Sequence, residues 1–263
     1  MNDARFQDYP SHIYSSNAGF TLVELAIAIF IIALLLGSIL VPLTTQVEQR
    51  QVSETQKTLE EIRESLIGFA VANSYLPCPD TTGDGVSDPA VPGVVPGACL
   101  DAEGFLPWVT LNTGQGDVWG NRFRYRISPE FTNTPVTSCN LTDGRINLCK
   151  SGAITVRTRD ATKNNPILAS NVVAVIISHG RNGYGATATD GTARALVPAQ
   201  NVDELLNANP PGTTFLSRPP TAISAVCNDG PPTGQPHCEF DDIVVSLSRF
   251  TLFNRMVAAG KLP

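Results

Sequence analysis

Glu24 places a carboxylate inside an otherwise apolar run that extends over residues 20–41. An ionisable side chain near the centre of a bilayer costs about 2.5–3.5 kcal/mol, so this carboxylate needs a cationic partner. No lysine or arginine occurs within a helical turn or two of it. Cleavage after Gly19 would create an α-ammonium group on Phe20 in the same layer. The α-ammonium of the same chain is poorly placed to contact Glu24. The expected partner is therefore the α-ammonium of a neighbouring subunit that is offset along the axis, which predicts a helical assembly.

A second set of residues with ligand chemistry lies in the segment 80–88, where acidic positions alternate around a glycine turn. Such oxygen-rich loops can wrap a hard cation, and this one resembles calcium loops. The expected ligand positions are Asp80, Thr82, Asp84, Val86 and Asp88. Thr82 stands where an acid is usual and no bidentate glutamate follows, so a plain acidic turn is the alternative. We expect no required cofactor, with calcium as the candidate ion.

The six cysteines form an even set without a CxxC pair in a loop-rich chain, which favours disulfides and an oxidising compartment. Six cysteines allow 15 pairings. The simplest joins neighbours in sequence: Cys78 with Cys99, Cys139 with Cys149, and Cys227 with Cys238. A zinc site from Cys227, His237 and Cys238 is disfavoured, because an adjacent histidine and cysteine are poorly placed for one tetrahedral site.

Two further patterns have both a structural and a functional interpretation. Ser178 and His179 follow an apolar strand, but neighbours on a strand point to opposite faces, which argues against a nucleophile–base pair. No G-x-S-x-G or P-loop pattern occurs, so we expect no enzymatic activity. Arg122, Arg124 and Arg126 alternate with apolar residues and so share one sheet face. A solvated outer face is the structural interpretation; an acidic contact between subunits or a nucleic-acid stripe are the alternatives.

Composition bounds the class of protein. The 263 residues are 42% hydrophobic and 16% charged, which excludes wholesale disorder and a polytopic membrane protein. A net charge of -6 disfavours extensive electrostatic binding to nucleic acid. A helix over residues 20–41 would be about 33 Å long, enough to cross a hydrocarbon core once. Two alternatives to cleavage after Gly19 are an uncleaved membrane anchor and a conventional signal peptide. The basic start and the small-residue cleavage site of a signal peptide are missing.

The elements that hold these residues follow from periodicity. Apolar residues at three-, four- and seven-residue steps continue the helix amphipathically over 42–73. Alternating runs predict strands at 122–127, 153–159, 171–178 and 242–247, a short helix at 249–259, and long loops at 76–104 and 210–236. The expected fold class is α+β, in which a head domain of residues 74–263 packs a sheet against the helix.

The segment Gly19-Phe20-Thr21-Leu22-Val23-Glu24 and the apolar run after it resemble the processing signal of type IV pilins and pseudopilins. The resemblance implies that residues 1–19 are a leader, that a prepilin peptidase cuts after Gly19, that Phe20 is methylated, and that Glu24 serves docking. It further implies a small antiparallel sheet wrapped on the upper helix. The leader departs from the family's pattern because it is long and nearly uncharged.

Shorter stretches at 76–80, 117–121 and 178–180 look like segments of pilin-like proteins. Together these features predict a minor pilin or pseudopilin of a pilus or type II secretion-like filament, with a single-pass inner-membrane helix and a periplasmic head. The implied partners are other subunits, the peptidase, an inner-membrane assembly platform and membrane lipid; nucleic acid is not expected. The alternative is a membrane-anchored periplasmic binding or enzymatic domain.

Overall fold

The structure is a computed structural model that describes residues 19–89, 98–132, 145–208, 212–231 and 234–262, with side chains described in the same ranges except 37–44. The chain divides into two compact units, Met1–Gln49 and Arg50–Pro263, which we describe separately. The second unit is referred to below as the head. It includes residues 50–73 of the long helix, so the upper part of that helix groups with the sheet.

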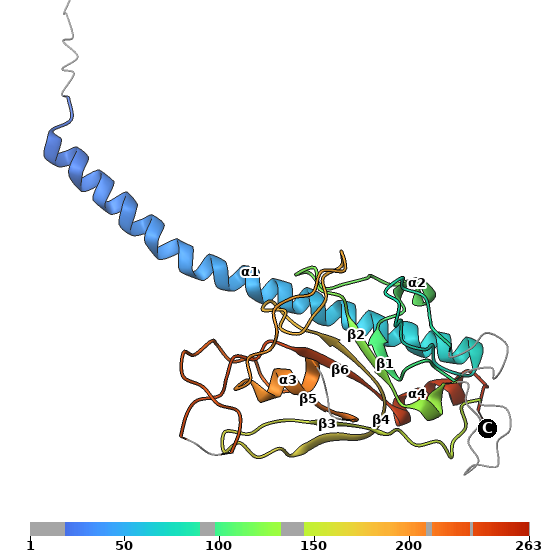
Figure 1. The fold of residues 1–263 in the computed structure, drawn as a ribbon. Helices are drawn as coiled ribbons and strands as arrows, with labels where there is room; N and C mark the ends of the chain where they lie inside the picture. The colour runs from blue at the N-terminus through green and yellow to red at the C-terminus, as the bar shows by residue number, and fades with distance from the viewer. Residues whose placement is uncertain (1–18, 90–97, 133–144, 209–211, 232–233, 263) are drawn as a thin grey trace, which may run out of the picture. The chain divides into compact units, whose positions relative to one another are not determined.

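The long helix α1 spans Leu22–Asn73 and appears in blue to cyan in Figure 1. Its upper part is amphipathic as expected: Leu59, Ile62 and Leu66 are buried, whereas the glutamates between them are exposed. The helix ends where Ser74 adopts a left-handed conformation with φ 67° and donates its N–H to the carbonyl of Ala70. The predicted end at residue 73 is confirmed.

A six-stranded sheet forms the centre of the head (Figure 1). Its order is β1-β2-β4-β3-β5, and β6 also pairs with β4. The strands are β1 Glu103–Phe105, β2 Arg124–Ile127, β3 Ile154–Arg157, β4 Ile167–Ser178, β5 Thr214–Leu216 and β6 Ile243–Ser248. The four strands expected from alternation are present, and β4 is longer than expected. Strand β5 lies inside a segment expected to be a loop, and β1 begins in another and ends one residue beyond it.

The sheet is mixed, so the expectation of an antiparallel sheet is wrong at one edge. Strands β3 and β5 pair in parallel, with Val156 opposite Phe215. The chain leaves β3, passes through β4 and the helix α3 (Val202–Ala208), and returns to the other side of β3. A crossover of this kind brings the second strand back in the same direction, whereas a tight hairpin would reverse it.

Ser128 joins two strands that pair with successive stretches of β4. Strand β2 pairs with residues 174–177 of β4, and β3 with residues 167–172. The fully buried Ser128 hydroxyl donates to the carbonyl of Val172 at 2.8 Å and accepts the N–H of Ala153 at 2.9 Å. The side chain therefore replaces the ladder hydrogen bonds that are missing between the two strands.

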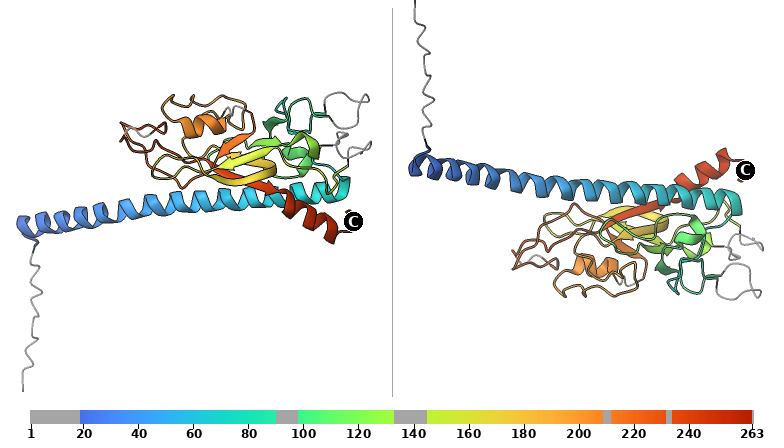
Figure 2. Two further views of the ribbon diagram at one scale, coloured as in Figure 1. Left: turned by 90° about the horizontal axis from the view of Figure 1, so that it is seen from below. Right: turned by 90° about the horizontal axis from the view of Figure 1, so that it is seen from above.

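The head has apolar packing on both faces of the sheet. One cluster combines α1 residues such as Leu66 with Tyr125 of β2 and with Met256 of the helix α4 (Arg249–Ala258). A smaller cluster on the other face contains Val175 of β4 and Phe215. In both views of Figure 2 the sheet lies between residues 50–73 of α1 and α3. The Ser248 side chain caps α4 by accepting the N–H of Phe250.

Three short elements complete the head. The helix α2 covers Trp108–Leu111, a 3-10 turn covers Pro129–Phe131, and α3 precedes β5. None of them was expected, because each is shorter than the window in which helical periodicity can be recognised.

Candidate functional site

The start of α1 is held by a reciprocal pair of side chains. Thr21 is the residue before the helix, and its hydroxyl accepts the N–H of Glu24 at 3.2 Å. The Glu24 carboxylate accepts the backbone N–H and the hydroxyl of Thr21, both at 3.3 Å. This is a capping box, in which two otherwise unpaired N–H groups at a helix start are satisfied. Glu24 thus has a local structural role in addition to the expected docking role.

Thr21 is the functional residue that sequence reasoning missed at this end. The signal was present in the sequence as Thr-Leu-Val-Glu, a Ser/Thr-x-x-Glu spacing directly before an apolar run. An uncapped N–H group is most costly where water is excluded, so the cap is valuable in an apolar environment. The hydrogen bonds also hold the carboxylate against Thr21, in the first turn of the helix.

Residues 20–36 expose nearly all of their large apolar side chains. Phe20 is 86% exposed and Leu34 is 60% exposed, and the side chains between them are similarly open. Burying apolar surface provides roughly 25 cal/mol per Å², so this segment gains its stabilisation only from contacts outside the chain. Among the residues that the structure describes, no helix is both long enough and apolar enough to cross a membrane. The span at 20–41 stays a prediction.

Two of the three expected disulfides are present. The structure joins Cys78 to Cys99 and Cys227 to Cys238, closing sequence separations of 21 and 11 residues. The third expected pair includes Cys139, which lies outside the described residues. Closing loops of these sizes stabilises a domain by about 3 kcal/mol each through the unfolded chain. The disulfides therefore act on the long loops that the composition predicted.

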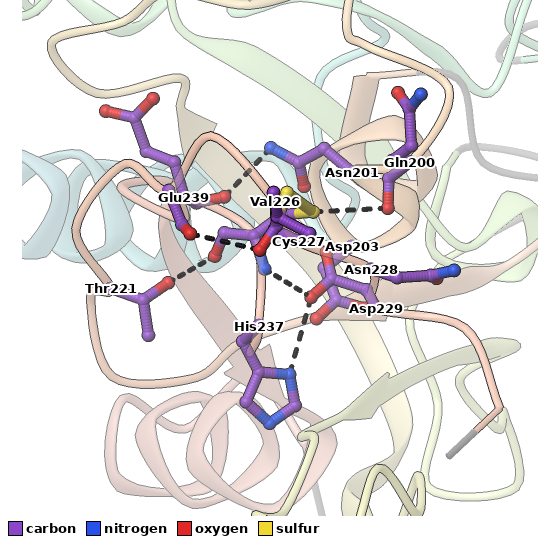
Figure 3. The surroundings of a disulfide bond; sticks show 12 residues. Gln200, Asn201, Asp203, Thr221, Val226, Cys227, Asn228, Asp229, His237 and Glu239 are labelled. Atoms are coloured by element: carbon purple, nitrogen blue, oxygen red, sulfur yellow. Dashed lines mark hydrogen bonds and ion pairs between the residues drawn. A yellow bond between two sulfur atoms is a disulfide. The ribbon is translucent and has the colours of Figure 1, made fainter. Parts of the chain in front are cut away.

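The Cys227–Cys238 disulfide lies in a polar environment, shown in Figure 3. The backbone N–H of Cys238 donates to the Asp229 carboxylate at 3.0 Å, and the Thr221 hydroxyl donates to the carbonyl of Cys238 at 2.5 Å. The disfavoured zinc interpretation is wrong here, because the two sulfurs that would have to be thiolates are bonded to each other. His237 instead lies with its Nδ1 3.4 Å from Asp229.

Behind this loop, buried charges form a continuous network. Asp203 is fully buried and accepts hydrogen bonds from Arg159 at 2.6 Å and from Arg218 at 2.7 Å. Arg218 extends to Asp229 at 3.4 Å, and Asp229 contacts His237. Ligand-type atoms of Asp203, Asp229 and His237 come within 4.8 Å of one another, but guanidinium groups already compensate the carboxylates. The network is an ion-pair cluster that fixes α3 and the disulfide loop.

A second acidic cluster has amides and a histidine as neighbours. Glu204, Asp241 and Asp242 bring carboxylate oxygens within 4.8 Å of one another. Burial and the charge of Asp242 raise the pKa of Glu204 to about 9, and burial raises the pKa of Asp241 to about 7. Gly180 has φ 59°, and an added Cβ would lie 2.5 Å from Asp241, so only glycine permits this approach. Glu204 therefore keeps its proton at neutral pH.

Ser178 and His179 point to different partners, as the strand geometry predicts. The Ser178 hydroxyl donates to Asp117 at 2.7 Å, whereas His179 Nδ1 lies 3.3 Å from Asp242. Burial raises the pKa of Asp117, although the hydrogen bond from Ser178 opposes the shift. Each side chain therefore has its own carboxylate, and the two do not form a nucleophile–base pair.

The proposed calcium loop is organised by its own backbone around Asp80. This fully buried carboxylate accepts the N–H groups of Thr82, Gly83 and Gly85 at 3.1, 2.6 and 2.7 Å. Such a nest of N–H donors satisfies a carboxylate charge in the way that a cation otherwise does. The buried Asp80 thus has a structural role as the centre of the turn.

The outer part of the same loop is also hydrogen-bonded. Asp88 accepts the N–H of Thr81 at 2.8 Å and that of Thr82 at 3.1 Å, and Asp84 accepts the N–H of Val86 at 2.8 Å. Burial acts to raise the pKa of Asp88, but hydrogen bonds from the Thr81 hydroxyl and from the N–H groups of Thr81 and Thr82 outweigh it and hold the pKa below its usual value. The acidic side chains of this loop do not gather into a group of three with ligand atoms within 4.8 Å. Calcium binding here stays a prediction.

The three arginines beside β2 are only partly exposed, so the expectation of a solvated outer face is wrong. Arg124 and Arg126 both contact the carboxylate of Glu103 on β1, the latter at 2.8 Å. Arg122 donates to the carbonyls of Gly83 and Thr189 at 2.9 and 3.2 Å. The expected common face is present, but β1 and neighbouring loops cover part of it, which sequence periodicity does not reveal.

A family model describing the prokaryotic N-terminal methylation motif matches residues 14–40. The chain carries the signal of type IV pilins and pseudopilins. No curated protein and no solved structure matches the chain. The motif supports a secreted, pilin-like or pseudopilin subunit that is anchored in a membrane or assembled in a pilus, and it implies a structural subunit rather than an enzyme.

The methylation motif includes the residues whose geometry is described above. Residues 14–18 lie outside the described part of the chain, while Gly19 and Phe20 precede the helix and are exposed. Thr21 and Glu24 form the capping box inside the motif. The motif suggests association with other pilin subunits and with a prepilin peptidase. It covers a small part of the chain, so the polar clusters of the head must be interpreted from their own chemistry.

Proposed function

We propose that this protein is a minor pilin or pseudopilin, a structural subunit of a type IV pilus or of a type II secretion-like filament. It is cleaved after Gly19, methylated at Phe20, and assembled through its N-terminal helix. The observation that supports this most directly is the methylation motif at residues 14–40. Before assembly the helix at 20–41 crosses the inner membrane once and the head lies in the periplasm.

The exposed apolar side chains of residues 20–36 support the proposal independently of the motif. A segment this apolar is covered either by lipid or by the same segment of neighbouring subunits. The two environments are chemically alike, so a subunit can pass from one to the other at a small change in free energy. An inner-membrane assembly platform would perform this transfer. This is the physical requirement for a helix that anchors first and polymerises later.

Glu24 would provide the specificity that apolar contact lacks. In the membrane its charge is costly, and a neighbour's new α-ammonium at Phe20 removes that cost when the two subunits are offset along the filament axis. The capping box holds the carboxylate at the start of the helix, close to where such an ammonium would lie. Docking would therefore depend both on the charge of Glu24 and on the fixed position of that carboxylate at the start of the helix.

The first test is the mass and N-terminal sequence of the protein from membranes of cells with and without prepilin peptidase. We expect a methylated Phe20 terminus only when the peptidase is present. An intact Met1 terminus in both strains would contradict the proposal and favour the alternative, a membrane-anchored periplasmic binding or enzymatic domain.

Matched substitutions separate docking from capping. Glu24→Gln retains a side chain that can close a capping box but loses the charge, whereas Thr21→Val loses the cap and retains the charge. We expect Glu24→Gln and Glu24→Ala to insert into the membrane normally and to be absent from sheared filaments. Thr21→Val should still enter filaments. Normal incorporation of Glu24→Gln would contradict the docking role.

We also propose calcium as a ligand of the loop at 80–88, because Asp84 is exposed and has acidic neighbours. About 1 mM calcium should then raise the unfolding temperature of the full chain, and Asp84→Ala should abolish the increase. An unchanged unfolding temperature on calcium addition would favour the plain acidic turn.

A further inference from the structure

We propose that a cavity in the head binds a compact oxyanion, namely a carboxylate or phosphoryl group on a small molecule. The cavity has a volume of about 430 Å³ and lies between the arginine face of β2, strand β1 and residues 185–187. This volume is in the range of small-molecule sites. The inference concerns residues of the head alone and does not depend on N-terminal processing.

The cavity has more positive than negative charge. Three guanidinium groups line it, from Arg122, Arg124 and Arg126, together with the carboxylates of Glu103 and Asp101. Glu103 lies between Arg124 and Arg126 and is shared by both. Three cations facing two carboxylates leave one positive charge uncompensated in a concave site, where potentials are focused.

Arg122 provides that uncompensated charge. Within the described residues it forms no ion pair; its two terminal nitrogens donate to backbone carbonyls of Gly83 and Thr189. Its guanidinium carbon lies 5.2 Å from the centre of the Phe105 ring. An added Cβ at Gly83 would lie 2.7 Å from Arg122, so the glycine allows the guanidinium to approach the turn. The charge is held in place before any ligand arrives, which lowers the entropic cost of binding.

Arg126 has the hydrogen-bonding capacity to hold an oxyanion. In the described part of the chain its guanidinium donates one hydrogen bond, from Nη1 to Glu103, and its buried Nε has no partner. A guanidinium has five N–H donors in a planar fork that matches carboxylate and phosphate oxygens. The unused donors of Arg126 therefore match the chemistry of the ligand, and Arg124, which is bound to Glu103 and to the carbonyl of Ala208, positions the shared carboxylate.

His179 supplies a different kind of group to the cavity wall. The residue is 2% exposed and lines the cavity, and its Nδ1 lies 3.3 Å from Asp242. Its Nε2 has no hydrogen-bond partner among the residues that the structure describes. When Nδ1 donates to Asp242, Nε2 accepts a hydrogen bond in the neutral imidazole and donates one in the imidazolium. An oxyanion that also has an O–H group can bind both the Arg126 guanidinium and Nε2 of His179. Hydrogen phosphate and citrate fit this description.

Calorimetric titration of the full chain in detergent tests this inference, with inorganic phosphate and citrate as probes and sodium chloride at matched ionic strength as the blank. We expect saturable heat with at least one probe. Arg126→Gln should weaken binding by about tenfold, because a charge-assisted hydrogen bond is lost. Arg126→Lys should weaken it by less, since the charge remains but the planar fork does not.

Arg157→Gln is the matched control, because this arginine lies on β3, which pairs with neither β1 nor β2, donates to the carbonyl of Asn165, and does not line the cavity. It should bind like the unchanged protein. Binding of phosphate alone would assign a phosphoryl ligand, and binding of citrate alone a carboxylate ligand. Absence of saturable heat with both probes at millimolar concentration, or equal weakening by Arg157→Gln and Arg126→Gln, would overturn the inference. Unchanged tryptophan fluorescence of each variant verifies that its head is folded.

Discussion

The N-terminal unit and the head differ in how far their apolar side chains are buried. In the first, side chains such as Phe20 and Leu34 remain more than half exposed. In the second, Leu59 and Phe123 are fully buried, and both faces of the sheet are covered. The head thus completes its own core, whereas the described N-terminal helix leaves its apolar side chains open to contacts from outside it. Helix α1 contributes residues to both units.

Charge shows the same contrast. Among the residues that the structure describes, the Glu24 carboxylate is bound only by Thr21, a neutral residue three positions away, so no cation there compensates its charge. Asp203 in the head is instead enclosed by two arginines from distant segments. Uncompensated charge in an apolar setting favours association, while compensated charge in a core favours one internal arrangement. The contrast teaches that the two units are stable for different reasons.

The largest effect is expected from breaking the internal charge network. Asp203→Ala leaves Arg159 and Arg218 buried without their carboxylate and should lower the free energy of unfolding of the head by about 3–5 kcal/mol. Urea unfolding of the full chain in detergent measures this, because both tryptophans, Trp108 and Trp119, lie in the head. Asp203→Asn should destabilise nearly as much.

The control for that experiment is an exposed ion pair on α1. Glu61 lies 3.7 Å from Lys57, and both side chains are largely exposed. Glu61→Ala should change the free energy of unfolding by less than about 0.5 kcal/mol. If Asp203→Ala costs no more than this control, the head does not depend on its internal charge network, and the contrast between the units fails.

A smaller effect is expected from pH. A carboxyl group whose pKa is higher in the folded state contributes stability that is present below its unfolded pKa and lost as pH rises through the folded pKa. Glu204, at about 9, and Asp241, at about 7, both behave in this way. The head should therefore be less stable at pH 8 than at pH 5, by at least about 2 kcal/mol. Urea midpoints at the two pH values measure the difference.

Glu204→Gln removes one of the titrating groups and should flatten this dependence, while Glu61→Gln should leave it unchanged. Stability that stays level or rises between pH 5 and pH 8 in the unchanged protein would show that the acidic cluster is not protonated in the folded head. Filament incorporation should be insensitive to Glu204→Gln, because the cluster lies in the self-sufficient unit.

The smallest effect concerns the N-terminal unit. Thr21→Val removes the cap of α1 and should destabilise its first turn by about 1 kcal/mol, whereas Thr21→Ser retains the hydroxyl and should have little effect. Amide hydrogen exchange of residues 21–24 in detergent should be faster in the valine variant alone. The urea midpoint of the head should not change. A shifted midpoint would mean that the two units are energetically coupled.

The features that depend on neighbouring residues in the sequence could largely be predicted. The helix end at Asn73, the four strands with alternating residues and the pairings Cys78–Cys99 and Cys227–Cys238 all match expectation. Strands β1 and β5 were missed because three residues are too few to show alternation. The parallel pairing of β5 was missed because it depends on where a distant crossover returns.

The sequence by itself determined the N-terminal site, since Gly19, Phe20, Thr21 and Glu24 lie within six residues and their chemistry depends on spacing along a short segment. Only the tertiary structure decided the sites of the head. Arg126 meets Glu103 across two strands, and Asp203 meets Arg159 from another part of the chain. Contacts between residues far apart in sequence follow from the packing of the sheet and its loops, and composition and periodicity contain no information about such distances.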